Sequence, residues 1–504
     1  MDFDYHALLP EIILAGTVVG VLLVDLSPAP KYWTAIVGLL GVFAAAIPIL
    51  TLGFCGDLAF CDDSGVRSML GDSYVVDKFS LVLKGLFLGA AFLSLLLSVS
   101  YLERDRYWEG EFYFLMLAST LGAVVMASSR DLVTMFVGLE LVTGPTFLMT
   151  GWRKGDPRSN EAALKFFIIG VLSAAVLLFG MGLVYGATGE ITFEGIRAAS
   201  ANLPDRSDAL FNLGVLFTIL GFAFKVSAVP FHFWTPDTYE GAPTPVTAYL
   251  SVVSKAAGFV GLLAIAYLAF AEARVNVWGP ALWILAAVSM TVGNLVALRQ
   301  TNIVRMLGYS SIAQGGFMLV PFGAALASNA TSVQLESVFS ATVTYLLIYA
   351  FMNLGAFGVV IAVRNRLGSS EIDDWSGLFR YAPGLATLLA IFFFSLAGIP
   401  PLAGWFAKFV MFRAALSIGG GWVIALAVIA VVNAVIAFAY YAKVVKSTWF
   451  DEVPTELETD ALASERVIPS LKLALGIAAL AVIVLGVFPD LVAGLGNLTT
   501  GFVE

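Results

Sequence analysis

Apolar runs recur along the whole chain and are separated by short polar loops. A helix that crosses a bilayer needs about 20 mostly apolar residues. Backbone groups in lipid have no water partner, so such runs must form helices. The pattern predicts an all-α integral membrane protein with fourteen transmembrane helices, near residues 8–26, 32–53, 79–101, 112–129, 131–150, 161–186, 210–238, 244–270, 279–298, 302–327, 335–363, 383–418, 422–449 and 469–491.

Two pairs of similar segments indicate an internal repeat. The predicted seventh helix contains KVSAVPFHFW and the twelfth contains LAGIPPLAGW, with Pro230 and Pro401 each four residues before a tryptophan. The fifth helix opens with DLVTMF at Asp131, and the tenth opens with NIVRML at Asn302. Both pairs are separated by 171 positions. The alternative interpretation is a chance similarity between apolar segments.

The common separation predicts two duplicated units of five helices. Because five is odd, the second unit is turned over in the membrane, and inverted repeats of this kind are a transporter architecture. The chain then divides into residues 1–105 with helices 1–3, residues 106–275 with the first unit (helices 4–8), residues 276–450 with the second unit (helices 9–13), and residues 451–504 with the C-terminal loop and helix 14.

Prolines predict breaks in the seventh and twelfth helices. Proline has no amide hydrogen and clashes with the preceding turn, so Pro230 and the Pro400–Pro401 pair should interrupt their helices. A broken backbone at membrane depth is tolerated only against protein or a wet cavity. We therefore expect water, and a route for protons, near both breaks.

The distribution of Lys and Arg predicts the orientation. Cytoplasmic loops of membrane proteins carry an excess of these residues. If both termini lie outside the cytoplasm, in a cell inner (plasma) membrane, the inner loops hold most of them. These are Lys31, Arg104, Arg106, Arg153, Lys154, Arg158, Arg299, Arg364, Arg366, Arg380, Lys443, Lys446 and Arg466. An even number of helices also requires both termini on one side.

Composition narrows the class of function. The chain is 59% hydrophobic and only 12% charged, and its net charge of −9 comes mostly from short loops. It has no basic stripe for nucleic acid, no GxGxxG that follows a strand and opens a helix, and no GxxxxGK[ST]. Two cysteines are too few for an iron–sulfur cluster or a structural zinc site. Cys55 and Cys61 fall in a predicted outer loop, as a disulfide or as two free thiols.

Among the charged residues within the predicted membrane segments, five are candidates for function: Glu140, Lys165, Lys225, Lys255 and Lys408. Placing a lysine or aspartate at a helix centre costs about 2.5–3.5 kcal/mol. Several such residues would exceed the stability margin of a typical protein unless they are paired or wet. Glu140 and Lys225 are the natural pair.

Lysine in these positions favours proton transfer. Arginine keeps its proton in proteins, whereas a buried lysine can release and regain one near neutral pH. We therefore predict Lys225 as a switch with Glu140 as its counter-ion, Lys255 as a central relay, and Lys408 as the carrier toward the outer half. His232 and water would bridge gaps.

Structural roles are the alternatives. The charges can instead hold helices together, Lys165 can extend to the headgroups, and His232 can cap a helix near the break. Lys84 is better explained as structural, and Glu11 and Glu161 lie toward helix ends or lack an obvious partner.

The run FKVSAVPFHFWTPDTYEGAPTPV at residues 224–246 resembles the signature of the antiporter-like membrane subunits of respiratory complex I, and WTPDTYEGAPTPV is similar to the subunit N branch of that family. SLAGIPPLAGWFAKF at 395–409 resembles the broken twelfth helix with its lysine. EAALKFF at Glu161 and RMLGYSSIAQGGF at Arg305 also match. The resemblance covers nearly the whole chain.

The resemblance implies fourteen helices, two inverted units and a place in the membrane arm of NADH:quinone oxidoreductase, a proton-pumping translocase. Partners would be the neighbouring antiporter-like subunit and the small membrane subunits. NADH, FMN, iron–sulfur clusters and quinone would belong to partner chains, and none to this one. It also implies proton-path roles for Glu140, Lys165, Lys225, Lys255 and Lys408.

One residue departs from the family pattern. The tenth helix often reads SSI-x-H, whereas this chain has Gln314 at the last position, so a proton path there must use water or bypass it. The competing interpretation is a subunit of a multi-subunit cation/proton antiporter, which shares the fold. A structural scaffold is hard to reconcile with so many buried lysines.

Overall fold

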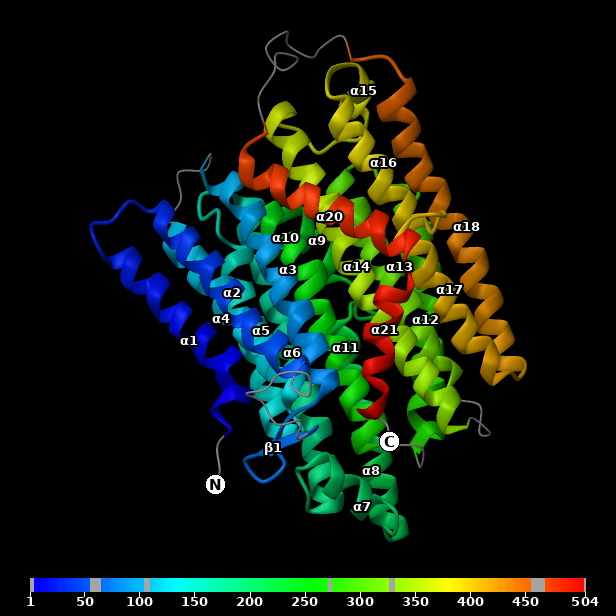
Figure 1. The fold of residues 1–504 in the computed structure, drawn as a ribbon. Helices are drawn as coiled ribbons and strands as arrows, with labels where there is room; N and C mark the ends of the chain where they lie inside the picture. Colours follow the sequence, from blue (N-terminus) through cyan, green and yellow to red (C-terminus); the bar gives the residue numbers. More distant parts are fainter. Residues whose placement is uncertain are drawn as a thin grey trace.

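The computed structural model describes residues 4–54, 65–103, 109–270, 274–325, 331–454 and 467–502, and the described part is almost entirely helical (Figure 1). The first part of the chain forms α1 (Tyr5–Leu26), α2 (Tyr32–Gly53), α3 (Lys78–Leu102), α4 (Glu109–Ser128), α5 (Leu132–Thr150), α6 (Pro157–Thr188), α7 (Phe193–Ser200), α8 (Asp205–Lys225), α9 (Trp234–Gly241), α10 (Thr244–Tyr249) and α11 (Lys255–Ala264). The second part forms α12 (Val275–Ala297), α13 (Ile303–Ala324), α14 (Ser332–Leu367), α15 (Leu378–Tyr381), α16 (Pro383–Ala397), α17 (Ala403–Ile418), α18 (Gly421–Phe450), α20 (Pro469–Val487) and α21 (Asp490–Leu498).

The described residues contain 12 helices long and apolar enough to cross a membrane, or up to 13 if a bent pair counts as one span. The prediction of fourteen is therefore not confirmed in number. Two predicted spans account for the difference. One is α13, which carries a series of polar side chains, and the other is divided into α16 and α17, of 15 and 16 residues. Each half is shorter than a bilayer requires.

A small antiparallel hairpin was not predicted. β1 (Arg67–Met69) pairs with β2 (Tyr74–Val76) between α2 and α3, and Tyr74 also forms an isolated bridge with Ser129 after α4. The hairpin lies beside the N-terminal end of α1 (Figure 1). Cys55 and Cys61 precede it and lie outside the described residues.

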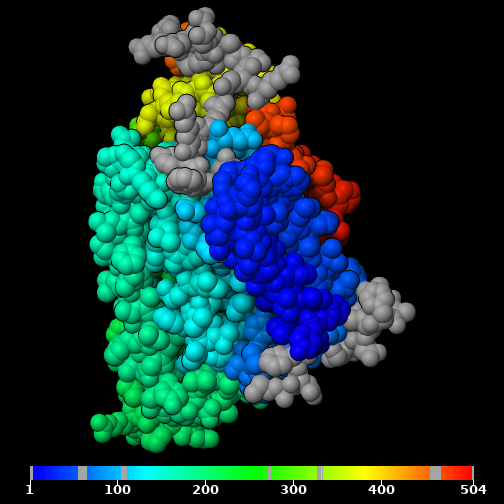
Figure 2. Space-filling view, turned by 90° about the vertical axis from the view of Figure 1, so that its left-hand side faces the viewer, coloured from blue at the N-terminus to red at the C-terminus, as the bar shows by residue number. Residues whose placement is uncertain are grey.

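The helices differ in how much of each is buried within the bundle. The span from Thr244 to Ala269, which combines α10, α11 and two π-helical segments, is 94% buried within its most apolar window, and so is α14. The same fraction is 28% for α1 and 33% for α18. Figures 1 and 2 show α1 on the outside of the bundle. The N-terminal end of α1 and the C-terminal end of α21 lie toward the same end of the bundle as α7, whereas α15 lies at the opposite end (Figure 1).

α5 and α13, which begin at the two similar segments, have matching N-terminal caps. The Asp131 and Asn302 side chains each accept hydrogen bonds from the backbone N–H groups two and three residues later, at 2.8 and 2.9 Å and at 3.0 and 3.2 Å. Such caps satisfy helix donors that would otherwise be unpaired. The next residue in each case donates to a carbonyl beyond a long helix, Ile191 after α6 and Ser370 after α14.

Candidate functional site

The break in the predicted seventh helix is confirmed. α8 ends at Lys225 and α9 begins at Trp234, with Pro230 between them. Ser227 has a φ of 61°, which turns the chain out of the helix. The N–H of Val229 then bonds to the hydroxyl of Ser289 on α12, at 2.9 Å. The break is therefore held by protein groups, as a broken backbone in a membrane requires.

Lys225, the last residue of α8, lies against α5. Its Nζ is 2.6 Å from Thr143 Oγ1 and 3.4 Å from Glu140 Oε1. The Lys225 side chain is 2% exposed, whereas that of Glu140 is 31% exposed. The structure thus brings together the two residues predicted to pair. The longer of the two contacts is the ion pair, so the hydroxyl of Thr143 is the nearer partner of the ammonium.

Lys255 lies at the centre of the molecule, directly after a π-helical segment, Leu250–Ser254. Such segments are often found at functional sites. The Nζ of Lys255 donates to the carbonyl of Val226 at 2.9 Å and to that of Ser311 at 3.1 Å. Val226 directly follows Lys225. The carbonyl that accepts from Lys255 therefore lies in the break after α8, one residue beyond Lys225.

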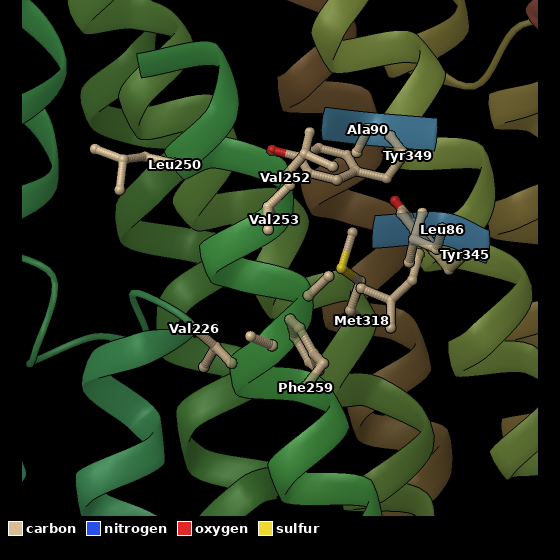
Figure 3. Close-up of a cluster of buried hydrophobic side chains, with 14 of the residues drawn as sticks. Leu86, Ala90, Val226, Leu250, Val252, Val253, Phe259, Met318, Tyr345 and Tyr349 are labelled. Atoms are coloured by element: carbon tan, nitrogen blue, oxygen red, sulfur yellow. The ribbon is translucent and has the colours of Figure 1, made fainter. Parts of the chain in front are cut away.

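Apolar side chains surround this position. Val226, Val252, Phe259 and Met318 lie together in a buried cluster that joins α8, the π-helical segment, α11 and α13 (Figure 3). In the described ranges, no carboxylate lies within ion-pair distance of Lys255. Its amino group is therefore held by neutral carbonyl oxygens rather than by an opposite charge.

Lys408 occupies an equivalent setting at the second break. α16 ends at Ala397 and α17 begins at Ala403, which confirms the predicted break in the twelfth helix. The Lys408 Nζ donates to the carbonyls of Leu396 at 3.1 Å and Ala397 at 2.6 Å, and it lies 4.9 Å from the centre of the Phe317 ring. Because α16 ends here, these two carbonyls cannot accept hydrogen bonds from the backbone N–H groups of a following helical turn.

Gln314 lies between Lys255 and Lys408. Its Nε2 donates to the carbonyl of Leu396 at 3.1 Å, the same oxygen that Lys408 uses, and its Oε1 accepts from the hydroxyl of Tyr345 at 2.6 Å. One turn earlier on α13, Ser311 binds Lys255 through its carbonyl and accepts from the hydroxyl of Tyr349 at 3.0 Å. Sequence reasoning did not find the two tyrosines, which lie in the buried cluster of Figure 3.

Lys165 lies apart from Lys225, Lys255 and Lys408, which we call the lysine row. Its side chain is 43% exposed and forms ion pairs with Glu161 at 2.7 Å and Asp237 at 2.8 Å. Asp237 also pairs with Arg305 of α13, which in turn binds Glu240. Lys165 was expected to need a partner or water, or to extend to the headgroups, and the structure gives it two acidic partners that are themselves partly exposed. The i, i+4 spacing of Glu161 and Lys165 was the available signal.

His232 lies within the break and is buried, and its ring is 4.9 Å from that of Phe233. Its Nδ1 has no hydrogen-bond partner in the part of the chain that the structure describes, and no hydrogen bond joins its ring to a lysine there. Among the described residues, no direct contact therefore supports the predicted role of His232 as a relay.

Across the described ranges, no three His, Cys, Asp or Glu side chains lie together as metal ligands would.

One ion pair was not predicted from the sequence. It joins Glu11 on α1 to Lys84 on α3, at 2.8 Å. Nothing in the sequence indicated that these two helices meet.

A family model described as NADH:quinone oxidoreductase/Mrp antiporter, TM, matches residues 129–436, which contain the two breaks and all the lysines of the row. This chain belongs to the NADH:quinone oxidoreductase/Mrp antiporter family. It is 43% identical over 448 residues to NADH-quinone oxidoreductase subunit N 2 of Streptomyces griseus subsp. griseus, covering 87% of this chain and 81% of that protein. The resemblance to complex I membrane subunits is therefore confirmed.

Two solved structures extend the comparison. A chain of respiratory complex I from Thermus thermophilus with bound aureothin is 30% identical, with a TM-score of 0.76 over 97% of this chain and 99% of that chain. A chain of the Mrp complex from Dietzia sp. DQ12-45-1b is 18% identical, with a TM-score of 0.83 over 99% and 98%. At that identity the second comparison establishes the fold alone.

Proposed function

We propose that this chain is a proton-translocating subunit of the membrane arm of NADH:quinone oxidoreductase. The observation that supports this most directly is the buried row of Lys225, Lys255 and Lys408, which begins at a half-buried carboxylate, Glu140. The amino groups of Lys255 and Lys408 contact carbonyl oxygens at a helix break, whereas that of Lys225 contacts Thr143 and Glu140 on α5. Proton transfer through a membrane needs groups that release and regain a proton while buried in protein, and lysine amines meet that need.

The Glu140–Lys225 pair acts as the switch in this mechanism. While the pair is closed, the carboxylate stabilises the ammonium of Lys225. When Glu140 moves away, the buried ammonium loses its counter-charge and passes a proton toward Lys255. The observed 3.4 Å distance, with Thr143 as the nearer partner, describes a loosely closed pair.

The segment between Lys255 and Lys408 runs through Gln314. Because an amide does not titrate, Gln314 positions the Leu396 carbonyl and the Tyr345 hydroxyl, and water carries the proton past it. Lys408 then receives the proton and passes it to the outer half.

The architecture we propose has fourteen membrane segments and two inverted five-helix units. α13 and the α16–α17 pair supply the two segments beyond the 12 long apolar helices. The matching caps at Asp131 and Asn302, and the matching breaks, support the duplication. The units span residues 106–275 and 276–450, between an N-terminal region of 1–105 and a C-terminal region of 451–504.

The assembly we propose places this chain in a bacterial plasma membrane, next to another antiporter-like subunit and small membrane subunits. NADH, FMN, iron–sulfur clusters and quinone act in partner chains, and their redox energy drives the switch. The relative in Streptomyces griseus, named as an NADH-quinone oxidoreductase subunit, supports this placement. The alternative, a subunit of a cation/proton antiporter, rests on a likeness of fold at 18% identity.

Replacement of either member of the switch tests the proposal. In membranes that contain the assembled enzyme, Lys225→Ala or Glu140→Ala should lower the proton gradient formed per NADH oxidised, with this subunit still present in the complex. Lys154→Ala, at an exposed loop position, is the matched control. If assembled enzyme with either change pumps like the control, the switch is wrong. If these membranes instead show a cation/proton exchange that is lost in the variants and is independent of NADH, the antiporter alternative is favoured.

A further inference from the structure

Asn353 is a buried polar residue that the proposed proton path does not use. It lies on α14 and is 0% exposed. Its Nδ2 donates to the hydroxyl of Ser251 at 2.6 Å. Its Oδ1 has no hydrogen-bond partner in the part of the chain that the structure describes. Among the described residues, the bond to Ser251 is therefore the only hydrogen bond that this side chain forms.

Ser251 lies in the π-helical segment Leu250–Ser254, which joins α10 to α11. Its hydroxyl donates to the carbonyl of Ala248, three residues earlier, at 2.7 Å. A serine side chain that bonds a nearby carbonyl offers the backbone an alternative to the regular bonds of an α-helix. Asn353 donates to the oxygen of the same hydroxyl. Two hydrogen bonds, one of them from α14, therefore fix the Ser251 side chain within the π-helical turn.

The π-helical turn decides where Lys255, the first residue of α11, points. In such a turn the backbone bonds join residues i and i+5 rather than i and i+4, so the turn contains one extra residue. One residue of an α-helix corresponds to a rotation of about 100°. Without the extra residue, Lys255 would be rotated by about that angle relative to α10. Its Nζ would then no longer face the carbonyls of Val226 and Ser311 to which it now donates.

The helices on the two sides of the turn are held separately. Thr244, at the start of α10, accepts a hydrogen bond from Arg364 of α14 at 2.7 Å. In α11, Gly258 packs closely on the end of α8, since a Cβ added there would lie 3.0 Å from the Cβ of Lys225. A rotation of α10 or of α11 would break one of these contacts. The π-helical turn therefore joins two segments whose directions are already fixed.

Asn353 is the third of three polar residues on one face of α14. Tyr345, Tyr349 and Asn353 are spaced four residues apart, which places them on the same side of a helix. Tyr345 donates to Gln314 and Tyr349 to Ser311, both on α13. This face of α14 thus supports the surroundings of Lys255 from two directions, through α13 and through the π-helical turn.

We propose that Asn353 is a positioning residue for Lys255. Its bond to Ser251 stabilises the π-helical turn, and the turn aims the amino group of Lys255 at the carbonyls of Val226 and Ser311. Asn353 itself neither binds nor transfers a proton. The inference rests on the proposed function, because Lys255 is the residue that Asn353 holds in place within the proton path.

Asn353→Leu and Ser251→Ala, each made in the assembled enzyme, test this role. Each removes one partner of the bond, so cryo-electron microscopy should show the turn relaxed toward an α-helix, with Lys255 Nζ no longer in contact with both carbonyls. Each variant should also lower the number of protons pumped per NADH oxidised. Thr342→Val is the matched control and should change neither result. It removes a buried hydroxyl of α14 that bonds the carbonyl of Val338 within the same helix, at 3.2 Å.

The double variant separates a positioning role from a general loss of stability. If Asn353 acts through Ser251, adding Asn353→Leu to Ser251→Ala should lower pumping no further. An additive loss overturns the proposal, and so does a Lys255 amino group that still contacts both carbonyls in the single variants. Ser251→Ala, the smaller change, keeps the test valid if Asn353→Leu fails to assemble.

The structural result also separates this proposal from the proposed function. If Lys255 is displaced in the variants while pumping is unchanged, Asn353 does position Lys255, and it is the role of Lys255 in the proton path that fails.

Discussion

At the scale of single residues, the row is defined by what the amino groups touch. Lys255 and Lys408 contact neutral carbonyl oxygens, whereas Lys225 has a carboxylate within 3.4 Å. A carbonyl accepts a hydrogen bond from an ammonium and from a neutral amine alike. The two inner lysines can therefore change protonation without losing their position, while Lys225 responds to the movement of Glu140.

Replacing Lys255 by arginine tests this difference. Lys255→Arg keeps the positive charge, but arginine does not release its proton in proteins. We expect the assembled enzyme to retain NADH oxidation by artificial acceptors and to lose most of its NADH-driven proton pumping. The measurement is the pH gradient across inverted membrane vesicles per NADH consumed, with Lys154→Arg as the control. Undiminished pumping in Lys255→Arg would remove this residue from the path.

Single-residue reasoning predicted which lysines are buried but not what they contact. Lys225, Lys255 and Lys408 were selected because a charged residue in an apolar run is costly. The structure buries all three, and their role in proton transfer stays a prediction. Lys165 was expected to be buried but is partly exposed, since its position on α6 faces outward. The partners of Lys255 could not be predicted, because they are backbone carbonyls on other helices.

At the scale of elements, both breaks followed from local sequence, because proline lacks an amide hydrogen. The caps at Asp131 and Asn302 were not predicted, although Asp or Asn before an apolar run is a typical cap. The hairpin of β1 and β2 was missed because each strand has only three residues. The contact between α1 and α3 that joins Glu11 to Lys84 depends on packing between helices, which local patterns do not specify.

The two helix caps give a prediction about stability. Asp131→Ala and Asn302→Ala each remove a side chain that accepts two backbone hydrogen bonds, and each should destabilise its helix by about 0.5–2 kcal/mol. Asp131→Asn should cost less than Asp131→Ala, because the amide oxygen still caps the helix. Thermal denaturation of the purified enzyme, monitored by the release of this subunit, measures the order of stability of these variants.

Asn302→Asp is the informative counterpart. The Nδ2 of Asn302 donates to Glu371 Oε1 at 3.2 Å, so a carboxylate there would meet another carboxylate. This variant should destabilise the subunit even though it restores the residue found at the first cap. Equal stability of Asn302→Asp and the wild type would show that the two caps are interchangeable, contrary to this expectation.

At the scale of the whole molecule, the start of α1 and the end of α21 lie at one end of the bundle (Figure 1). Lys and Arg are concentrated in loops at the opposite end, and that asymmetry predicts the cytoplasmic side. The orientation decides the direction of the proposed path, since Lys408 would then deliver protons toward the end that holds the termini.

Thiol labelling in intact cells tests the orientation. In a background with Cys55→Ser and Cys61→Ser, Val66→Cys lies in an exposed segment before β1, and Gly155→Cys lies in the loop between α5 and α6. A membrane-impermeant maleimide should label Val66→Cys in intact cells, provided an outer membrane, where present, admits it. Gly155→Cys should be labelled only after the membrane is permeabilised. The reverse pattern would turn the protein over, so that Lys408 would lie at the end of a path toward the cytoplasm and the direction proposed here would be wrong.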